Sequence, residues 1–253
     1  MALRIINVLK SDGGLAAQKK LLNKAGFVID LSSEKGIRFC SEKDGFQSVG
    51  RKLRALKAGV TFLGPGDYHH LSLHFLAKLK ESPVLLLFDH HSDMMESPPG
   101  TISCGSWAAL ALAERRVKKC LVVGINPKDE GFLKLKARPE IAFFPKDIPH
   151  DSKVSGVLRE LARSPGPLYI SIDKDVLLSG EAVTNWDQGS MTLEELLDLL
   201  RVAGRAKPLA GADICGEWPA LPVEMLHSHE DKKNIEVNQT ANLKILDALS
   251  EVM

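Results

Sequence analysis

The sequence has few cysteines, almost no net charge and no long apolar run. Its four cysteines form no C-x-x-C pair, which argues against a disulfide framework and favours a reducing compartment. The formal net charge is +1 over 253 residues, so no global field favours nucleic acid or an anionic membrane. No apolar run approaches the ~20 residues that span a bilayer, and the early charges of the N-terminal segment are unlike a signal peptide. We therefore expect a cytoplasmic protein that binds neither nucleic acid nor membrane.

The chain also lacks repeats, low-complexity linkers and shifts in composition, so we expect one domain over residues 1–253. Short apolar stretches alternate with helical ones, which favours βαβ units and a mainly parallel sheet with helices on both faces. The expected strands are 2–8, 27–31, 37–40, 59–64, 85–88, 120–124, 141–144, 168–172 and 209–214. The expected helices are 15–24, 46–56, 71–80, 106–116, 154–163, 192–202 and 234–253. Thr192 and Glu195 are expected to form a capping box.

What the chain does contain is a buried strand that ends in acidic residues and histidines. The stretch 85–93, LLLFDHHSD, is apolar up to Phe88 and polar from Asp89 onward. Because side chains alternate along an extended chain, Asp89, His91 and Asp93 are expected on one side. Buried carboxylates without partners are costly, and a bound cation offsets that cost. The pattern therefore predicts a metal site at the end of this strand.

Two further strands end in residues of the same kind. Asp173 and Asp175 follow the strand 168–172, and His69 and His70 follow an earlier one. Ligands of open α/β sheets bind outside the carboxyl ends of the strands, so we expect the three clusters to meet there. Together with Asp89 and Asp93 they gather four carboxylates, which two divalent ions neutralise. Imidazole and carboxylate ligands without a thiolate favour manganese, with iron, cobalt, nickel and zinc as alternatives.

The order of these motifs resembles that of the ureohydrolase family, which includes arginases, agmatinases and formiminoglutamases. That family carries G-G-D-H-S, D-A-H-x-D and S-x-D-x-D after successive strands. Here 66–69 (GDYH), 89–93 (DHHSD) and 171–175 (SIDKD) stand at those places. The resemblance spans residues 60–214 and implies a three-layer, arginase-like α/β fold.

The resemblance also implies a ligand set for two manganese ions. One ion is expected to bind His69, Asp89, Asp93 and Asp173. The other is expected to bind Asp89, His91, Asp173 and Asp175, with Asp89 and Asp173 bridging. His70 is the alternative to His69, because the sequence departs from the family motif at this point.

The activity that the resemblance implies is hydrolysis of a non-peptide C–N bond by a metal-bridging hydroxide. The substrate is expected to be a small guanidino, amidino or formimino compound. Asp175 is expected to orient the hydroxide, and His70 or His90 to relay a proton to the leaving group. Assembly into homo-oligomers is a further expectation that comes with the family.

The chain departs from arginases at three places. Cys104 stands where arginases carry a histidine, and Val176 stands where the third motif usually continues with proline. Gly216 occupies the place of a glutamate that grips the guanidinium group, and Glu217, one residue later, is a candidate substitute. These departures weaken the case for arginine or agmatine as the substrate.

Two other functions fit the same motifs. A metal-dependent amide deacetylase is favoured by the pair His69-His70, and a non-catalytic metal-binding member is favoured by the lost arginase residues. A cavity that is open over the metals favours catalysis, whereas one filled by Trp186 or Trp218 favours a structural role.

Three remaining features have plain structural interpretations. Trp107 is expected in the core, residues 184–191 form a polar turn or a substrate contact, and the cluster His227, His229 and Glu230 forms a solvated loop.

Overall fold

The computed structural model describes residues 5–253, and its centre is an eight-stranded sheet. The strand order is β2-β1-β4-β10-β9-β5-β7-β8, and every neighbouring pair is parallel. These strands are β1 (Ile6–Lys10), β2 (Phe27–Asp30), β4 (Val60–Phe62), β5 (Val84–Phe88), β7 (Lys119–Ile125), β8 (Ile141–Pro145), β9 (Leu168–Asp173) and β10 (Leu209–Cys215). Two further strands, β3 (Cys40–Glu42) and β6 (Thr101–Ser103), form a separate antiparallel pair.

Helices connect the strands. They are α1 (Gly13–Ala16), α2 (Lys19–Leu22), α3 (Lys43–Leu53), α4 (Ser72–Leu76), α5 (Trp107–Ala113), α6 (Glu130–Leu135), α7 (His150–Arg163), α8 (Leu193–Ala206) and α9 (His229–Val252). Short 3-10 turns cover Gly66–Leu71, Lys174–Val176 and Glu224–Leu226. The capping box of α8 is present as expected, with the Thr192 and Glu195 side chains bonded to each other's backbone. In the part of the chain that the structure describes, no helix is long and apolar enough to cross a bilayer.

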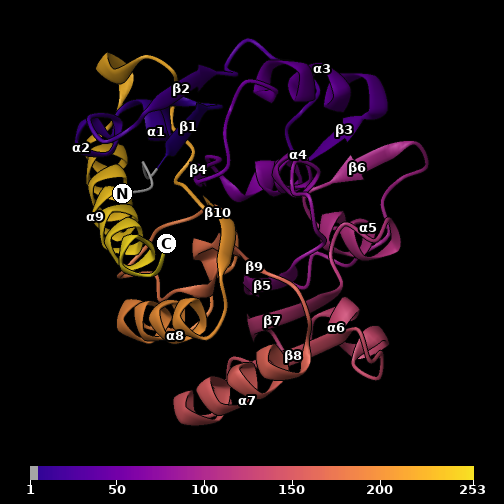
Figure 1. The fold of residues 1–253 in the computed structure, drawn as a ribbon. Coiled ribbons are helices and arrows are strands. Elements are labelled where there is room, and N and C mark those ends of the chain that lie inside the picture. Colours follow the sequence, from indigo (N-terminus) through magenta and orange to yellow (C-terminus); the bar gives the residue numbers. More distant parts are fainter. Residues whose placement is uncertain (1–4) are drawn as a thin grey trace.

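The helices form layers on both faces of the sheet (Figure 1). Side chains of β5 alternate between two apolar clusters: Val84, Leu86 and Phe88 pack on one face, and Leu85 and Leu87 on the other. The first face is covered by α1, α2, α7, α8 and α9, and the second by α3, α4, α5 and α6. This alternation buries both sides of a continuous apolar strand, as a parallel sheet requires. The predicted three-layer α/β fold is therefore confirmed.

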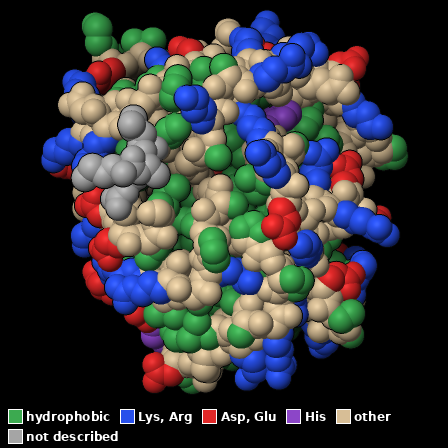
Figure 2. All heavy atoms as spheres, in the orientation of Figure 1, with side chains coloured by type: hydrophobic (Ala, Val, Ile, Leu, Met, Phe, Trp, Pro, Cys, Tyr) green, Lys and Arg blue, Asp and Glu red, His purple; other side chains and the backbone are tan. Residues whose placement is uncertain are grey.

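The surface carries charges of both signs. On the face seen in Figure 2, Lys and Arg side chains are spread among acidic, apolar and other residues. This distribution is in line with the formal net charge of +1.

Several predicted elements differ from the observed ones. The helix expected at 15–24 is two short helices, and the helix expected at 71–80 is limited to α4. The strand expected at 37–40 begins only at Cys40, because Phe39 has a φ of 62°, which interrupts an extended chain. The start of the strand expected at 2–8 lies outside the described residues. The loop expected around 227–230 is wrong, since His229 and Glu230 open α9 and the buried His227 bonds to the carbonyl of Leu221.

Candidate metal centre

The acidic residues meet at the carboxyl ends of four neighbouring strands, β4, β10, β9 and β5. Phe88 of β5 lies opposite Ile172 of β9, and Cys215 of β10 lies opposite Asp173. Asp89 and Asp173 therefore stand at the same level on adjacent strands. By the alternation of each strand, they face the side of the sheet that α3 to α6 cover.

The residues after β5 form a turn rather than a continued strand. Asp93 has a φ of 52°, and the carboxylate of Asp89 accepts a hydrogen bond from the backbone N–H of His91 at 2.7 Å. Trp107, fully buried as expected, donates its indole N–H to Asp93 at 2.5 Å. The expectation that a straight chain aligns Asp89, His91 and Asp93 is thus wrong in detail. The turn brings the three side chains together instead.

His69, which follows β4, contributes an imidazole ring to the pocket. Its Nδ1 atom lies 2.9 Å from Asp93 and 3.4 Å from Asp89. The same atom lies 3.8 Å from Asp173. All four side chains are buried. This is the set expected for the first metal.

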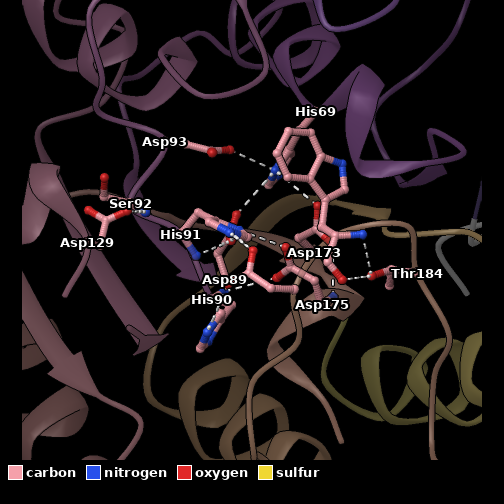
Figure 3. Close-up of polar contacts among 12 residues, drawn as sticks. His69, Asp89, His90, His91, Ser92, Asp93, Asp129, Asp173, Asp175 and Thr184 are labelled. Carbon is pink, nitrogen blue, oxygen red and sulfur yellow. Dashed lines mark hydrogen bonds and ion pairs between the residues drawn. The ribbon is translucent and has the colours of Figure 1, made fainter. Parts of the chain in front are cut away.

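A second set forms around His91. Its Nδ1 atom lies 2.9 Å from Asp175 and 3.5 Å from Asp89. Asp89 therefore belongs to both sets, with one oxygen toward each histidine. Figure 3 shows the two histidines and the carboxylates of Asp89, Asp173 and Asp175 gathered at this point. The structure thus brings together all six residues that were expected to bind metal.

Hydrogen bonds fix the orientation of both rings through their second nitrogen atoms. The Nε2 atom of His69 lies 2.8 Å from the hydroxyl of Ser171, which donates its hydrogen to Asp213 at 2.5 Å. Ser171 therefore accepts from Nε2 of His69, so in the neutral ring the proton lies on Nε2 and Nδ1 is available as a metal ligand. The Nε2 atom of His91 donates in the same way to Asp187 at 2.9 Å.

Burial and mutual repulsion raise the pKa of three carboxyl groups in this pocket, those of Asp89, Asp173 and Asp175. Burial and the charge of Asp89 raise the pKa of Asp175 to about 7, and burial and Asp175 raise the pKa of Asp173 to about 6. Burial alone lowers the pKa of His69, but its hydrogen bonds to Asp89 and Asp93 outweigh burial and raise it. The protein around the pocket therefore does not fully compensate the negative charge of the buried carboxylates. Their oxygens, together with the imidazole nitrogens, form a set of donors that fits divalent cations.

A cavity of about 150 Å³ opens over these residues. Its wall includes Met95, Cys104 and Trp186, and its charged lining consists of aspartates and the two histidines. Trp186 forms part of the wall without filling the space, and Trp218 turns away to bond with Asp231. The cavity is thus open above the proposed metal positions.

The segment 184–191 helps to build this wall rather than forming only a surface turn. The buried carboxylate of Asp67 accepts from the indole N–H of Trp186 at 2.9 Å and from the amide of Asn185 at 3.0 Å. Its other oxygen accepts from Arg38 at 2.7 Å. Asp67 therefore holds the segment against the turn that carries His69.

His70 and His90 do not reach the cavity. The Nε2 atom of His70 bonds to Ser41 at 2.9 Å, away from the carboxylates. His90 follows Asp89 by one residue and takes the opposite direction; in Figure 3 its ring points away from the cluster. The structure therefore gives no geometric support to the expected relay of protons by either residue.

Glu217 also lies away from the cavity, so its position gives no support to the expectation that it substitutes for the glutamate of arginases. It is buried behind the metal pocket, where one oxygen accepts from Lys174 at 2.5 Å and from Asn242 at 2.6 Å. Its other oxygen accepts from Gln18 at 2.6 Å. Alternation along β9 explains this arrangement, because Lys174 points to the face opposite Asp173.

The comparison with known families agrees with the geometry. A model described as the arginase family matches residues 41–226. The chain belongs to the arginase family. This arginase-family protein is 34% identical over 244 residues to an uncharacterised protein of Thermotoga maritima, an alignment that covers 96% of this chain and 89% of that protein.

Solved structures share the fold of this arginase-family chain. Proclavaminate amidino hydrolase from Streptomyces clavuligerus aligns with a TM-score of 0.66 and 18% identity over 98% of this chain and 92% of that chain. Arginase from Bacillus cereus aligns with a TM-score of 0.67 and 15% identity over 97% of this chain and 98% of that chain. The resemblance of the motifs to ureohydrolases is therefore confirmed at the level of family and fold.

Proposed function

We propose that this protein is a binuclear metal-dependent hydrolase that cleaves a non-peptide C–N bond in a small guanidino, amidino or formimino compound. Membership of the arginase family supports a hydrolase acting on C–N bonds. The observation that carries the proposal is the position of Asp89, whose two oxygens face His69 and His91. One shared carboxylate between two histidine sets is the arrangement that a pair of metal ions requires.

The residues that would hold the metals are the six that meet in the pocket. The first position would use His69, Asp89, Asp93 and Asp173. The second would use Asp89, His91, Asp173 and Asp175. When bound, two divalent ions supply a water molecule of lowered pKa and stabilise the negative charge that develops during attack. Manganese fits the oxygen and nitrogen donors of both sets, with iron, cobalt, nickel and zinc as alternatives.

Side chains that line the cavity would position the water and the substrate. Asp175 lines the cavity and accepts a hydrogen bond from the backbone N–H of His90 at 3.0 Å, which suits it to orient the attacking water. Trp186 presents an apolar wall that limits access of other water molecules. Asp129 adds another carboxylate to the lining, so a planar cationic carbon centre such as an amidinium suits the cavity.

The test is a substrate screen with protein that carries two metal ions per chain by metal analysis. Guanidino, amidino, formimino and acetylated amines are incubated with the protein, and the release of urea, ammonia or amine is measured. We expect activity on a member of the first three classes, and Asp89→Asn is expected to abolish it. Glu236→Gln, an exposed acidic residue of α9, is the matched control. Release of no product from the whole panel by fully loaded protein would contradict the proposal.

The deacetylase alternative depended on His69 and His70 acting together beside a metal. His70 instead bonds to Ser41 outside the cavity, and His69 alone joins the carboxylates. The acetylated amines in the panel test this alternative directly.

A further inference from the structure

A buried thiol lies against the metal pocket. Cys215 ends β10 opposite Asp173 of β9, and its S–H donates to the Asp173 carboxylate at 3.1 Å. The same oxygen lies 3.8 Å from Nδ1 of His69. Donor atoms of His69, Asp173 and Cys215 all lie within 4.8 Å of one another. Three different donors thus surround one point on the inner side of the pocket.

Two glycines pack against the carboxylate that Cys215 contacts. Gly216 has a φ of 80°, and a Cβ atom there would lie 2.4 Å from Asp173. A Cβ atom on Gly66 would lie 2.6 Å from the other oxygen of the same carboxylate. The chain therefore closes around Asp173 from both sides, and this packing keeps the sulfur atom of Cys215 beside the pocket.

The other cysteines lack this arrangement. Cys40 is exposed, and Cys120 lies within β7 in the apolar core. Cys104 lines the cavity, but within residues 5–253 the groups of donors close enough to share an ion include no cysteine besides Cys215. The thiol of Cys215 is thus distinguished by its neighbours and not by burial alone.

We propose that Cys215 is a ligand of the first metal position, beside His69 and Asp173, and that it makes this position selective for thiophilic ions. The inference rests on the proposed function, because it concerns one of the same two metal positions. Thiolate ligands favour zinc, iron and cobalt over manganese. On metal binding the S–H bond breaks, a sulfur–metal bond forms, and the proton leaves to solvent. The two positions then differ, with sulfur at the first and only oxygen and nitrogen donors at the second.

The competing interpretation is that Cys215 only donates its S–H to Asp173 and holds that carboxylate in place. The two roles differ in a direct spectroscopic property. A thiolate bound to cobalt(II) gives a charge-transfer absorption in the near ultraviolet, whereas a thiol bonded to a carboxylate gives none.

The experiment loads the full-length protein with cobalt(II) and records its absorption spectrum with the metal content per chain. We expect the charge-transfer band in the wild type and in Cys40→Ser, and its loss in Cys215→Ser. In competition between zinc and manganese, Cys215→Ser is expected to reduce the preference for zinc on the order of 10- to 100-fold. A variant that retains Cys215 as its single cysteine should keep the band, which tests the proposal even if Cys215→Ser does not fold.

Other outcomes separate this inference from the proposed function. Two cobalt ions per chain without the band, or a band that survives in Cys215→Ser, would overturn the role of Cys215 and leave the binuclear site intact. Failure of the wild type to bind cobalt, zinc or manganese would overturn both.

Discussion

At the scale of single residues, the pocket depends on groups that orient the ligands as much as on the ligands themselves. Each histidine uses one nitrogen toward the carboxylates and the other toward a fixed acceptor. For His69 that acceptor is Ser171, which is buried, and for His91 it is Asp187, whose side chain is 67% exposed. Asp187 is therefore the orienting residue that substitution can remove with least disturbance of the fold.

We expect Asp187→Asn to weaken binding at the second metal position on the order of 10- to 100-fold, because a neutral amide oxygen is a weaker acceptor than the carboxylate, so it orients His91 less firmly and lowers the basicity of the ring. The measurement is a calorimetric titration of metal into the metal-free protein. Glu236→Gln is the matched control and should bind as the wild type does. Equal weakening in both variants, or none in Asp187→Asn, would contradict the role of Asp187.

That the six candidate metal ligands lie together could be predicted from the sequence, because they follow apolar strands in a specific order. The direction of neighbouring side chains was harder to predict. His69 and His70 are adjacent residues of the same type, yet His69 faces the carboxylates and His70 faces Ser41. Cys215 has no pattern around it in the sequence, and only the register of β10 against β9 places it beside Asp173.

At the scale of elements, apolar strands were predictable, including the three-residue β4, whereas the polar strands β3 and β6 were not. β3 and β6 are three residues each and pair with one another, so tertiary contact rather than local preference defines them. α6 was missed for a similar reason, although Asp129 caps its first turn. The strand order could not be predicted from the sequence either, because the pattern of apolar residues identifies which residues are buried but not which strands are neighbours.

The pair Lys174–Glu217 connects elements behind the pocket and provides a test at this scale. Both side chains are buried, so Lys174→Met leaves an uncompensated carboxylate and should lower the free energy of unfolding by about 3–5 kcal/mol. The double variant Lys174→Met, Glu217→Gln should lose less, because no buried charge remains. Chemical denaturation of the three proteins measures the difference.

The control for this prediction is Lys134→Met, which removes the exposed pair with Glu130 on α6. It should change stability little, because solvent screens exposed charges. If the single variant at Lys174 were as stable as the double variant, the buried pair would not have the importance assigned to it.

At the scale of the whole molecule, the metal pocket joins strands from distant parts of the chain. His69, Asp89, Asp173 and Cys215 follow or end four different strands that lie side by side in the sheet. Unfolding separates these ligands, so ions that bind the pocket bind the folded state selectively. Metal binding should therefore stabilise the entire fold.

We expect removal of metal by a chelator to lower the melting temperature of the protein. An ion at 100 times its dissociation constant contributes about 2.7 kcal/mol, which corresponds to roughly 5–10 °C for a domain of this size. Thermal unfolding followed by circular dichroism, with and without the chelator, measures the shift. Asp89→Asn should show little further change on chelation, and an unchanged wild-type melting temperature would contradict the expectation.

The amides that hold Glu217 come from opposite ends of the chain, Gln18 in the segment between α1 and α2, and Asn242 in α9. Neither lies within residues 41–226, the segment shared with the arginase-family model. In a fragment limited to that segment, Glu217 would lose both amide donors, and the sheet would lose β1 and β2 at one edge. Any minimal version of this protein must therefore retain the N-terminal segment that carries Gln18 and the C-terminal helix that carries Asn242, although neither residue lines the cavity.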